Sequence, residues 1–274
     1  MKKLMNLEPS RSLKGFLAFL PFVILLLLYF SASNERLEAN PYDKLLPSFT
    51  QIADAVDRFA FTPDKRSGDY LFWKDTAASV YRICLGITIS AGLGLLIGML
   101  SGLLPLFRAG FSPLITIVSL IPPMAILPIL FISFGLGELA KVMLIIIGTA
   151  PVIIRDIQGH VRQLPSEILI KAQTLGASTW LVAIRVVLPQ IMPRLIAAVR
   201  LSLGTAWLFL IAAEAIAAQE GLGYRIFLVR RYMSMDVILP YVIWITTLAF
   251  MMDFSLRKLS TLCFPWYHHQ EAGK

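Results

Sequence analysis

The sequence has little charge and almost no cysteine. Only 15% of its 274 residues are charged, whereas 57% are hydrophobic, and the mean hydropathy is +0.72. A soluble domain carries about 25% charged residues, so this composition argues against one. The two cysteines, Cys84 and Cys263, are far apart in sequence and are expected at different depths of a membrane. We therefore expect neither a disulfide nor a metal site from them.

Motifs for catalysis and nucleotide binding are missing as well. No glycine-rich phosphate loop ends in Gly-Lys-Ser or Gly-Lys-Thr, so an ATP-driven process would need its ATPase on another chain. We expect no catalytic residue, no bound cofactor and no metal, since His160, His268 and His269 have no carboxylate or cysteine companions. The net charge of +8 does not indicate nucleic acid, because positive residues of membrane proteins collect in cytoplasmic loops.

Long apolar runs dominate the chain. They are solid rather than alternating and can cross a hydrocarbon core of about 30 Å, which predicts an all-α polytopic protein in the lipid bilayer, with one transmembrane domain over residues 1–274. We predict about six spans, near residues 16–30, 77–104, 113–134, 140–154, 193–213 and 237–254. The first run could be a cleaved signal peptide, but its end at Tyr29-Phe30-Ser31 has only weak small-residue cleavage chemistry and more spans follow, so we interpret it as a retained span.

Charges between the runs predict the orientation. Segment 34–74 has no net positive charge, whereas the stretch from Arg155 to Arg194, which contains segment 156–192, has five basic and two acidic residues. The positive-inside rule therefore places 34–74 outside, and both termini and 156–192 in the cytoplasm. Ser48 is the expected N-cap of an amphipathic helix in 34–74. The loop with Arg230-Arg231 fits this rule poorly.

Several residues inside the runs have structural interpretations. Gly94 and Gly98 form a small-xxx-small pair, which predicts close helix packing. Arg82 lies about one turn inside the second span, and we interpret it as a side chain that snorkels to the outer interface. Asp253 and Arg257 are spaced i,i+4, which predicts an ion pair.

Other residues are candidates for a translocation pathway. Arg200 offers a donor that suits an oxyanion, and Ser202 and Thr205 offer hydroxyl groups further along the same span. Snorkelling of the Arg200 side chain to the membrane surface explains this residue equally well. Glu214 is an embedded carboxylate, and ionisable residues at such depth default to functional candidates. The interpretation that we favour is that Glu214 caps the turn before Gly221-Leu-Gly223. The full set of pathway candidates is Pro122, Pro123, Arg200, Ser202, Thr205 and Glu214.

Segment 156–192 is the most distinctive part of the sequence. Within it, residues 165–189 read as two short helices, separated by Gly176 and closed by Leu188-Pro189, with Ser178 as a cap of the second. Ile168, Ala172 and Leu175 share one face. A helix this short gains stability when its apolar face docks on a partner. Periodicity alone allows that partner to be another protein or the lipid surface.

This segment resembles the EAA loop of importer-type ABC transporter permeases. Gly176 is followed after nine residues by Val186-Val187-Leu188-Pro189, where the family has Ile, any residue, Leu and Pro. In that register Ile170 and Lys171 stand at the Glu and first Ala positions of the family motif. The resemblance implies that an ATPase docks here. The coupling candidates are Glu167, Ile168, Ile170, Lys171, Ala172, Leu175, Gly176, Ala177, Leu188 and Pro189.

Further motifs resemble the nitrate, sulfonate, taurine and bicarbonate branch of these permeases. They lie at residues 119–128, 134–138, 175–178, 212–214, 221–223 and 264–268. The resemblance implies a type I ABC importer permease fold in the bacterial inner (plasma) membrane, and import of a small anion-like solute. It also implies three kinds of partner: a second permease copy, two cytoplasmic ATPases that hold ATP-Mg, and a solute-binding protein outside. The alternative is a stand-alone secondary transporter or channel, for which an inverted repeat and paired ionisable residues are missing.

Overall fold

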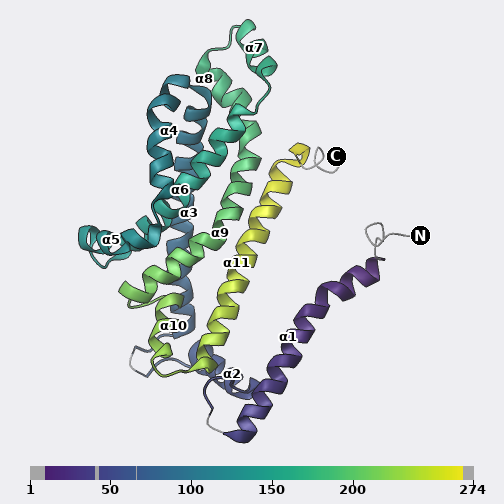
Figure 1. The fold of residues 1–274 in the computed structure, drawn as a ribbon, viewed down its shortest axis with the longest axis vertical. Helices are drawn as coiled ribbons and strands as arrows, with labels where there is room; N and C mark the ends of the chain where they lie inside the picture. Colours follow the sequence, from purple (N-terminus) through teal and green to yellow (C-terminus); the bar gives the residue numbers. More distant parts are fainter. Residues whose placement is uncertain (1–9, 41–42, 66, 268–274) are drawn as a thin grey trace.

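The structure is a computed structural model that describes residues 10–40, 43–65 and 67–267. His268 and His269 lie outside these ranges. The expected all-α class is confirmed, since the described residues form helices and no strand (Figure 1). The elements are α1 Arg11–Ala39, α2 Phe49–Val56, η2 Asp57–Phe61, α3 Leu71–Leu103, α4 Pro105–Leu120, η3 Pro123–Ile126, α5 Leu127–Phe134, α6 Glu138–Arg162, α7 Ser166–Thr174, α8 Thr179–Val182, η4 Ala183–Val187, α9 Leu188–Ala217, α10 Leu222–Arg230 and α11 Met235–Cys263.

By length and apolar composition, the described part of the chain has four helices that can cross a membrane. They are α1, α3, the continuous helix Thr179–Ala217 and α11, and the bent pair of α4 with η3 and α5 makes a fifth if it counts as one span. Our prediction of six spans exceeds this number. The difference is α6, whose apolar centre is flanked by ionisable residues at both ends and which packs between α3 and α9.

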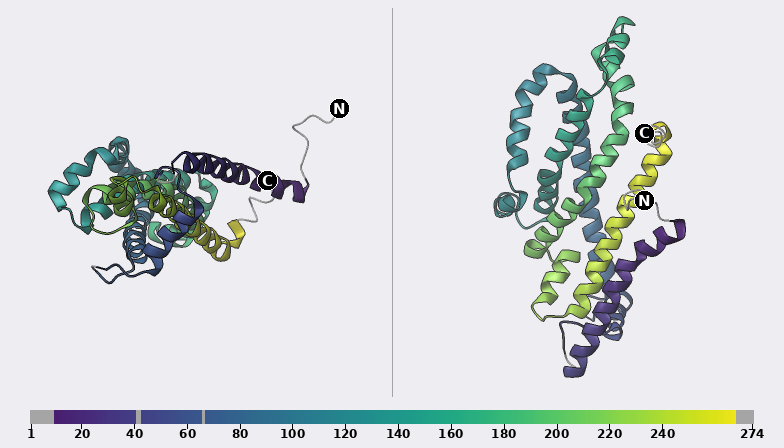
Figure 2. Two further views of the ribbon diagram at one scale, coloured as in Figure 1. Left: turned by 90° about the horizontal axis from the view of Figure 1, so that it is seen from below. Right: turned by 45° about the vertical axis from the view of Figure 1, so that its right-hand side comes forward.

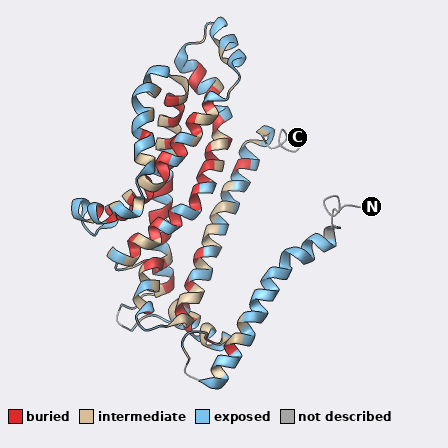
Figure 3. Ribbon diagram, viewed as in Figure 1, coloured by how far each residue is buried: buried red, intermediate tan, exposed pale blue. Residues whose placement is uncertain are grey.

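Helices α3, α6 and α9 form the core of the bundle (Figure 3). The predicted close packing of Gly94 and Gly98 is confirmed, because both face α6 so closely that a Cβ atom at either would lie within 3 Å of Ile153 or Ile157. Small residues allow such contact between helices in a membrane, where no hydrophobic drive brings helices together. The three helices therefore pack as one unit.

The proline-rich stretch bends the third predicted span. A helix already begins at Pro105, rather than near Pro113 as expected, because proline is well tolerated in the first turn of a helix. α4 ends at Leu120, and the chain turns by 83° before the η3–α5 pair. Pro122-Pro123 explains the break, since the residue before a proline avoids helical geometry and proline donates no backbone hydrogen bond.

Helix α1 lies apart from this core in all views (Figures 1 and 2). Its contacts with the rest of the chain are near its C-terminal end, where the Tyr29 hydroxyl donates to the carbonyl of Pro47 at 2.7 Å and the Tyr29 ring packs on Phe49. The predicted amphipathic helix follows as α2, and Ser48 caps it as expected, in a complete capping box with Gln51. α2 packs on α11.

The bundle has two distinct ends. At one, which we call the α7 end, α7 and α8 project beyond the other helices (Figure 1). At the other, the α10 end, lie α2 and α10. The last turns of α11 and the N-terminal half of α1 both extend from the α10 end toward the α7 end (Figure 2).

Candidate functional site

The projecting segment at the α7 end is built as the sequence predicts. α7 begins after Pro165 and ends just before Gly176, whose φ of +81° lies in the left-handed region that favours glycine. The second helix starts at Thr179, and the Ser178 hydroxyl accepts the Leu181 N–H at 3.3 Å, which confirms the expected cap. Both short helices therefore owe their ends to local sequence.

The two faces of α7 differ from the expected pattern. Leu169 and Ala172 pack against the bundle core, so Ala172 does not share an exposed face with Leu175. Leu175 is 88% exposed, and Ile170 and Trp180 are exposed as well. The apolar side chains that α7 and α8 leave uncovered are Ile168, Ile170, Leu175, Trp180 and Leu181. We call these five residues the apolar tip.

The prediction that Leu188-Pro189 closes this segment is wrong. The helix continues through both residues, and Thr179–Ala217 forms one run of 39 residues. Pro189 lies in the first turn of α9, directly after the π-helical turn η4. Because proline donates no backbone N–H, a regular α-helical bond is missing here, and the π-helical turn is the irregularity that accompanies it. Trp180 and Leu181 of the apolar tip consequently lie on the helix that continues into α9, and the turn at residues 175–178 joins α7 to the start of that helix.

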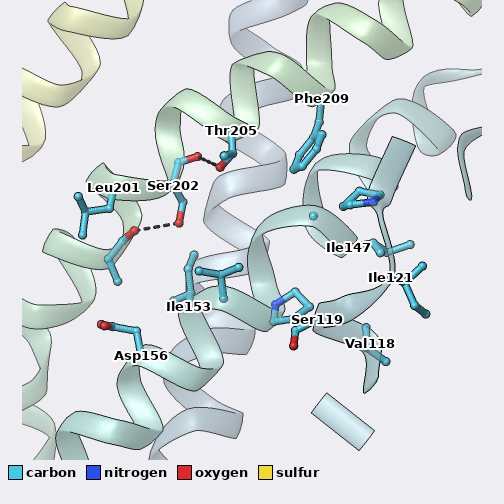
Figure 4. A pocket seen from close by; sticks show the side chains of 15 residues that line it. Val118, Ser119, Ile121, Ile147, Ile153, Asp156, Leu201, Ser202, Thr205 and Phe209 are labelled. Carbon is cyan, nitrogen blue, oxygen red and sulfur yellow. Dashed lines mark hydrogen bonds between the residues drawn. The ribbon is translucent and has the colours of Figure 1, made fainter. Parts of the chain in front are cut away.

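Halfway along the bundle, a cavity of about 330 Å³ lies between the bent pair, α6 and α9 (Figure 4). The predicted pathway residues Pro123, Ser202 and Thr205 line it. The Ser202 hydroxyl donates to the Ala198 carbonyl at 2.9 Å, and the Thr205 hydroxyl donates to the Ser202 carbonyl at 2.9 Å. Their oxygen atoms can still accept, but their protons are used within α9. The wall is mostly apolar.

Charges at this cavity are balanced. Asp156 is the one ionisable residue in its lining, and Arg194 donates to both its carboxylate oxygens at 2.6 and 2.8 Å. The pathway candidate Arg200 lies elsewhere: it donates twice to Asp253 on α11, at 2.8 and 3.0 Å. Asp253 thus has Arg200 as its hydrogen-bonded partner, because a planar guanidinium can donate twice to one carboxylate, while the predicted partner Arg257 interacts with Asp253 only as a more distant charge. Pro122 lies in the bend, outside the lining.

A buried polar cluster lies at the α10 end. Arg82 is 1% exposed, so the interpretation that it snorkels to the interface is wrong. Its guanidinium pairs with Glu138 and, at 2.7 Å, with Glu214. Glu214 is fully buried and also accepts from the Ser79 hydroxyl at 2.8 Å and from the Gly223 N–H at 2.9 Å. The last contact confirms that Glu214 caps the turn before α10.

A second pair reinforces the same end of the bundle. Asp75 on α3 is fully buried and accepts from Arg225 on α10 at 2.8 Å, from the Gly221 N–H at 2.9 Å and from the Tyr241 hydroxyl at 3.2 Å. Sequence reasoning missed this group, because its members are about 150 residues apart.

Glu138 connects this cluster to its surroundings. It is the first residue of α6, its side chain is 53% exposed, and both Arg82 and Lys141 donate to it. The hydrogen bond from Arg82, followed by that from Lys141, lowers the pKa of Glu138 to about 2. Glu138 is therefore ionised at any physiological pH.

Comparison with known proteins agrees with this architecture. Residues 93–261 match the family described as binding-protein-dependent transport system inner membrane component. The chain is 35% identical to the taurine transport system permease protein TauC of Escherichia coli over 73% of this chain and 72% of that one, and 30% identical to the putative aliphatic sulfonates transport permease protein SsuC of Bacillus subtilis over 71% and 70%. It is 33% identical to the bicarbonate transport system permease protein CmpB of Synechococcus elongatus over 67% and 66%.

The fold has a counterpart among solved structures. The methionine ABC transporter MetNI, in inward-facing conformations, matches with a TM-score of 0.56 at 21% identity, over 67% of this chain and 94% of that one. This likeness confirms the expected permease fold of ABC transporters. The chain belongs to the family of binding-protein-dependent transport system inner membrane components, the permease subunits of ABC transporters.

Proposed function

We propose that this chain forms the membrane pathway of an ATP-driven importer and that the apolar tip is where a cytoplasmic ATPase docks. The observation that carries the proposal is the exposure of the tip, part of which lies on the helix that continues into the wall of the cavity. Apolar side chains left uncovered at the end of a membrane bundle favour a protein partner. A short amphipathic helix in a groove of that partner is a common mode of recognition.

The continuous helix gives a mechanism for coupling. Ser202 lies 23 residues after Thr179, which corresponds to about 35 Å along an α-helix at 1.5 Å per residue. A helix of this kind transmits a displacement of α8 to the cavity wall. Helices α3 and α6 pack tightly together and therefore resist that displacement. The opposite wall belongs to the bent pair, which joins the core through a hydrogen bond from Arg155 to Ser119 at 3.0 Å. ATP-driven motion at the tip would thus widen or narrow the cavity.

The remaining partners and the orientation complete the proposal. We place the α7 end and both termini in the cytoplasm, which supports access of an ATPase to the basic segment 156–192. Two copies of this chain, two ATPases that hold ATP-Mg, and a binding protein at the α10 end would form the importer. The solute would be small and anion-like, of the nitrate, sulfonate, taurine or bicarbonate class, in keeping with the permeases it resembles.

The test is ATP-dependent uptake in vesicles that contain the chain, its ATPase and its binding protein. Leu175→Asp places a charge on the apolar tip and should uncouple ATP hydrolysis from uptake. Thr174→Asp is the matched control, because Thr174 is the exposed neighbour and its hydroxyl bonds only within α7. It should behave as the wild type. Full uptake with Leu175→Asp in an assembled complex would contradict the docking role.

Two other substitutions are less suitable. Gly176→Asp would strain a left-handed backbone position, at a cost of about 1–2 kcal/mol, and Ala172→Asp would disturb the packing of α7 on the bundle. Either could lower uptake for reasons unrelated to docking.

The same vesicles test the alternative function, a stand-alone transporter or channel. That function is excluded if solute flux requires ATP and the ATPase. Solute flux through vesicles that contain this chain alone would support the stand-alone transporter or channel instead.

A further inference from the structure

Basic side chains accompany the apolar tip, and the docking of apolar surface alone does not explain them. Arg162 at the end of α6, Lys171 on α7 and Arg185 in η4 are all exposed. None of the three forms an ion pair with another described residue, whereas Arg194 and Arg200, further along toward the bundle, each pair with an aspartate. The positive charge around the tip is therefore available to a partner.

Two of these basic residues share a helical face with members of the apolar tip. Lys171 follows Ile168 by three residues and precedes Leu175 by four, and residues at these spacings lie on one face of a helix. Arg185 follows Leu181 by four residues, along the run that continues into α9. A positive charge thus lies beside exposed apolar surface on α7 and again on the second short helix.

The acidic residue of this stretch leaves the tip positively charged. From Arg162 to Arg185 the chain has three basic residues and one acidic residue, Glu167. Glu167 lies four residues before Lys171, a spacing that allows an ion pair on a helix, yet these two described residues do not pair. Glu167 instead occupies the first turn of α7, where the N-terminal end of the helix favours a carboxylate.

The arrangement of these charges favours a protein partner over anionic lipid. A helix that lies on a lipid surface separates its basic face from its apolar face. On α7, however, Lys171 stands between Ile168 and Leu175 on the same face. In addition, α7 and α8 project beyond the other helices of the bundle (Figure 1). A surface that mixes apolar and basic side chains at such a projection is suited to a groove with an apolar floor and acidic edges.

We propose that the ATPase groove that receives the apolar tip has carboxylate groups at its rim, and that Lys171 and Arg185 contact them. The apolar side chains supply the buried area of the contact. The two basic side chains select the partner, because a groove with a neutral or basic rim leaves them unpaired or repels them. The inference rests on the proposed function, since it names the chemistry of the partner that docks at the same surface.

The test measures the Kd between the chain and the ATPase that supports uptake in the vesicle assay. The chain is held in nanodiscs of phosphatidylcholine, which has no net charge, so that anionic lipid does not contribute. Lys171→Glu and Arg185→Glu should each raise the Kd about tenfold or more, because each brings like charges together, whereas Lys171→Arg should keep the wild-type Kd. Arg231→Glu is the matched control, since it makes the same charge change at an exposed position of the α10 end, and it should bind as the wild type.

A carbodiimide cross-link detects the acidic partner without a charge reversal. The reagent joins a lysine amine to a carboxylate as an amide, with no spacer between them. The assembled wild-type complex should therefore give a cross-link from Lys171 to an aspartate or glutamate of the ATPase, identified by mass spectrometry. Lys171→Arg should remove this product and still bind the ATPase, because a guanidinium keeps the charge but does not form the amide.

The outcomes separate this proposal from the proposed function. Wild-type Kd values for Lys171→Glu and Arg185→Glu, or a complex that gives no cross-link from Lys171, would overturn the acidic groove. So would a loss of affinity that appears only in nanodiscs containing phosphatidylglycerol, which would assign the basic residues to lipid. The docking role itself would stand in each case if Leu175→Asp still uncouples uptake. Absence of ATP-dependent uptake by the wild type would instead reject the importer.

Discussion

Substitution of Gly98 by alanine tests whether the α3–α6 contact holds the bundle together. A Cβ atom at Gly98 would lie 2.8 Å from Cβ of Ile157 and 2.9 Å from the backbone oxygen of Ile154. Neither neighbour is the free end of a flexible side chain, so the two helices must separate. Overpacking of this kind costs about 1–3 kcal/mol.

The matched control is Gly92→Ala on the same helix. No atom lies within 4 Å of a Cβ atom placed at Gly92. Both substitutions gain the same helix propensity, about 1 kcal/mol for glycine to alanine, and the difference between them therefore isolates packing. We expect Gly92→Ala to be neutral or stabilising, and Gly98→Ala to be about 1–3 kcal/mol less stable than Gly92→Ala.

The assay is denaturant unfolding of the purified chain in mild detergent, with the free energy taken from the midpoint and slope. Intrinsic fluorescence is a suitable signal, because Trp207 is buried in the core. Equal unfolding free energies for the two variants would refute the reasoning. That result would mean that α3 and α6 adjust their separation freely and that the glycines do not set it.

Three further predictions concern side-chain pairs and caps. Arg82→Met leaves Glu214 as a buried unpaired charge and should destabilise the chain by about 3–5 kcal/mol in the same unfolding assay, with partial recovery in Arg82→Met/Glu214→Gln. Arg200→Asp places two carboxylates side by side on neighbouring spans and should lower stability by at least about 1 kcal/mol, and the swap with Asp253→Arg should restore part of it; no recovery would speak against the pair. Ser178→Ala should cost the second short helix about 1 kcal/mol and speed amide exchange over residues 179–182, whereas unchanged exchange would show that the cap is dispensable.

The sequence alone determined the features that depend on neighbouring residues. Apolar runs fixed the membrane class, and Ser48, Ser178 and Gly176 marked helix ends that the structure reproduces. These signals are local, because a cap or a left-handed turn involves residues only a few positions apart. The family resemblance likewise depended on short motifs, and the comparisons confirm it.

Only the tertiary structure decided which charges meet. Arg82 and Glu214 are 132 residues apart, and Arg200 and Asp253 are 53 apart, so no helical spacing could reveal either pair. The sequence alone offered snorkelling for Arg82 and a partner four residues away for Asp253, because sequence spacing reveals only contacts between neighbouring residues. In a membrane interior, however, a buried charge is stabilised by whichever opposite charge the helix packing brings within hydrogen-bond distance.

The same distinction applies to the segment at the α7 end. Its sequence determined two short helices and their caps. It did not determine that Ala172 packs inward while Leu175 is exposed, or that the helix runs through Pro189 into α9. Those features depend on where the bundle ends and on which side of α7 meets it. That arrangement arises from the packing of α3, α6 and α9, which the sequence specifies only through contacts between distant residues.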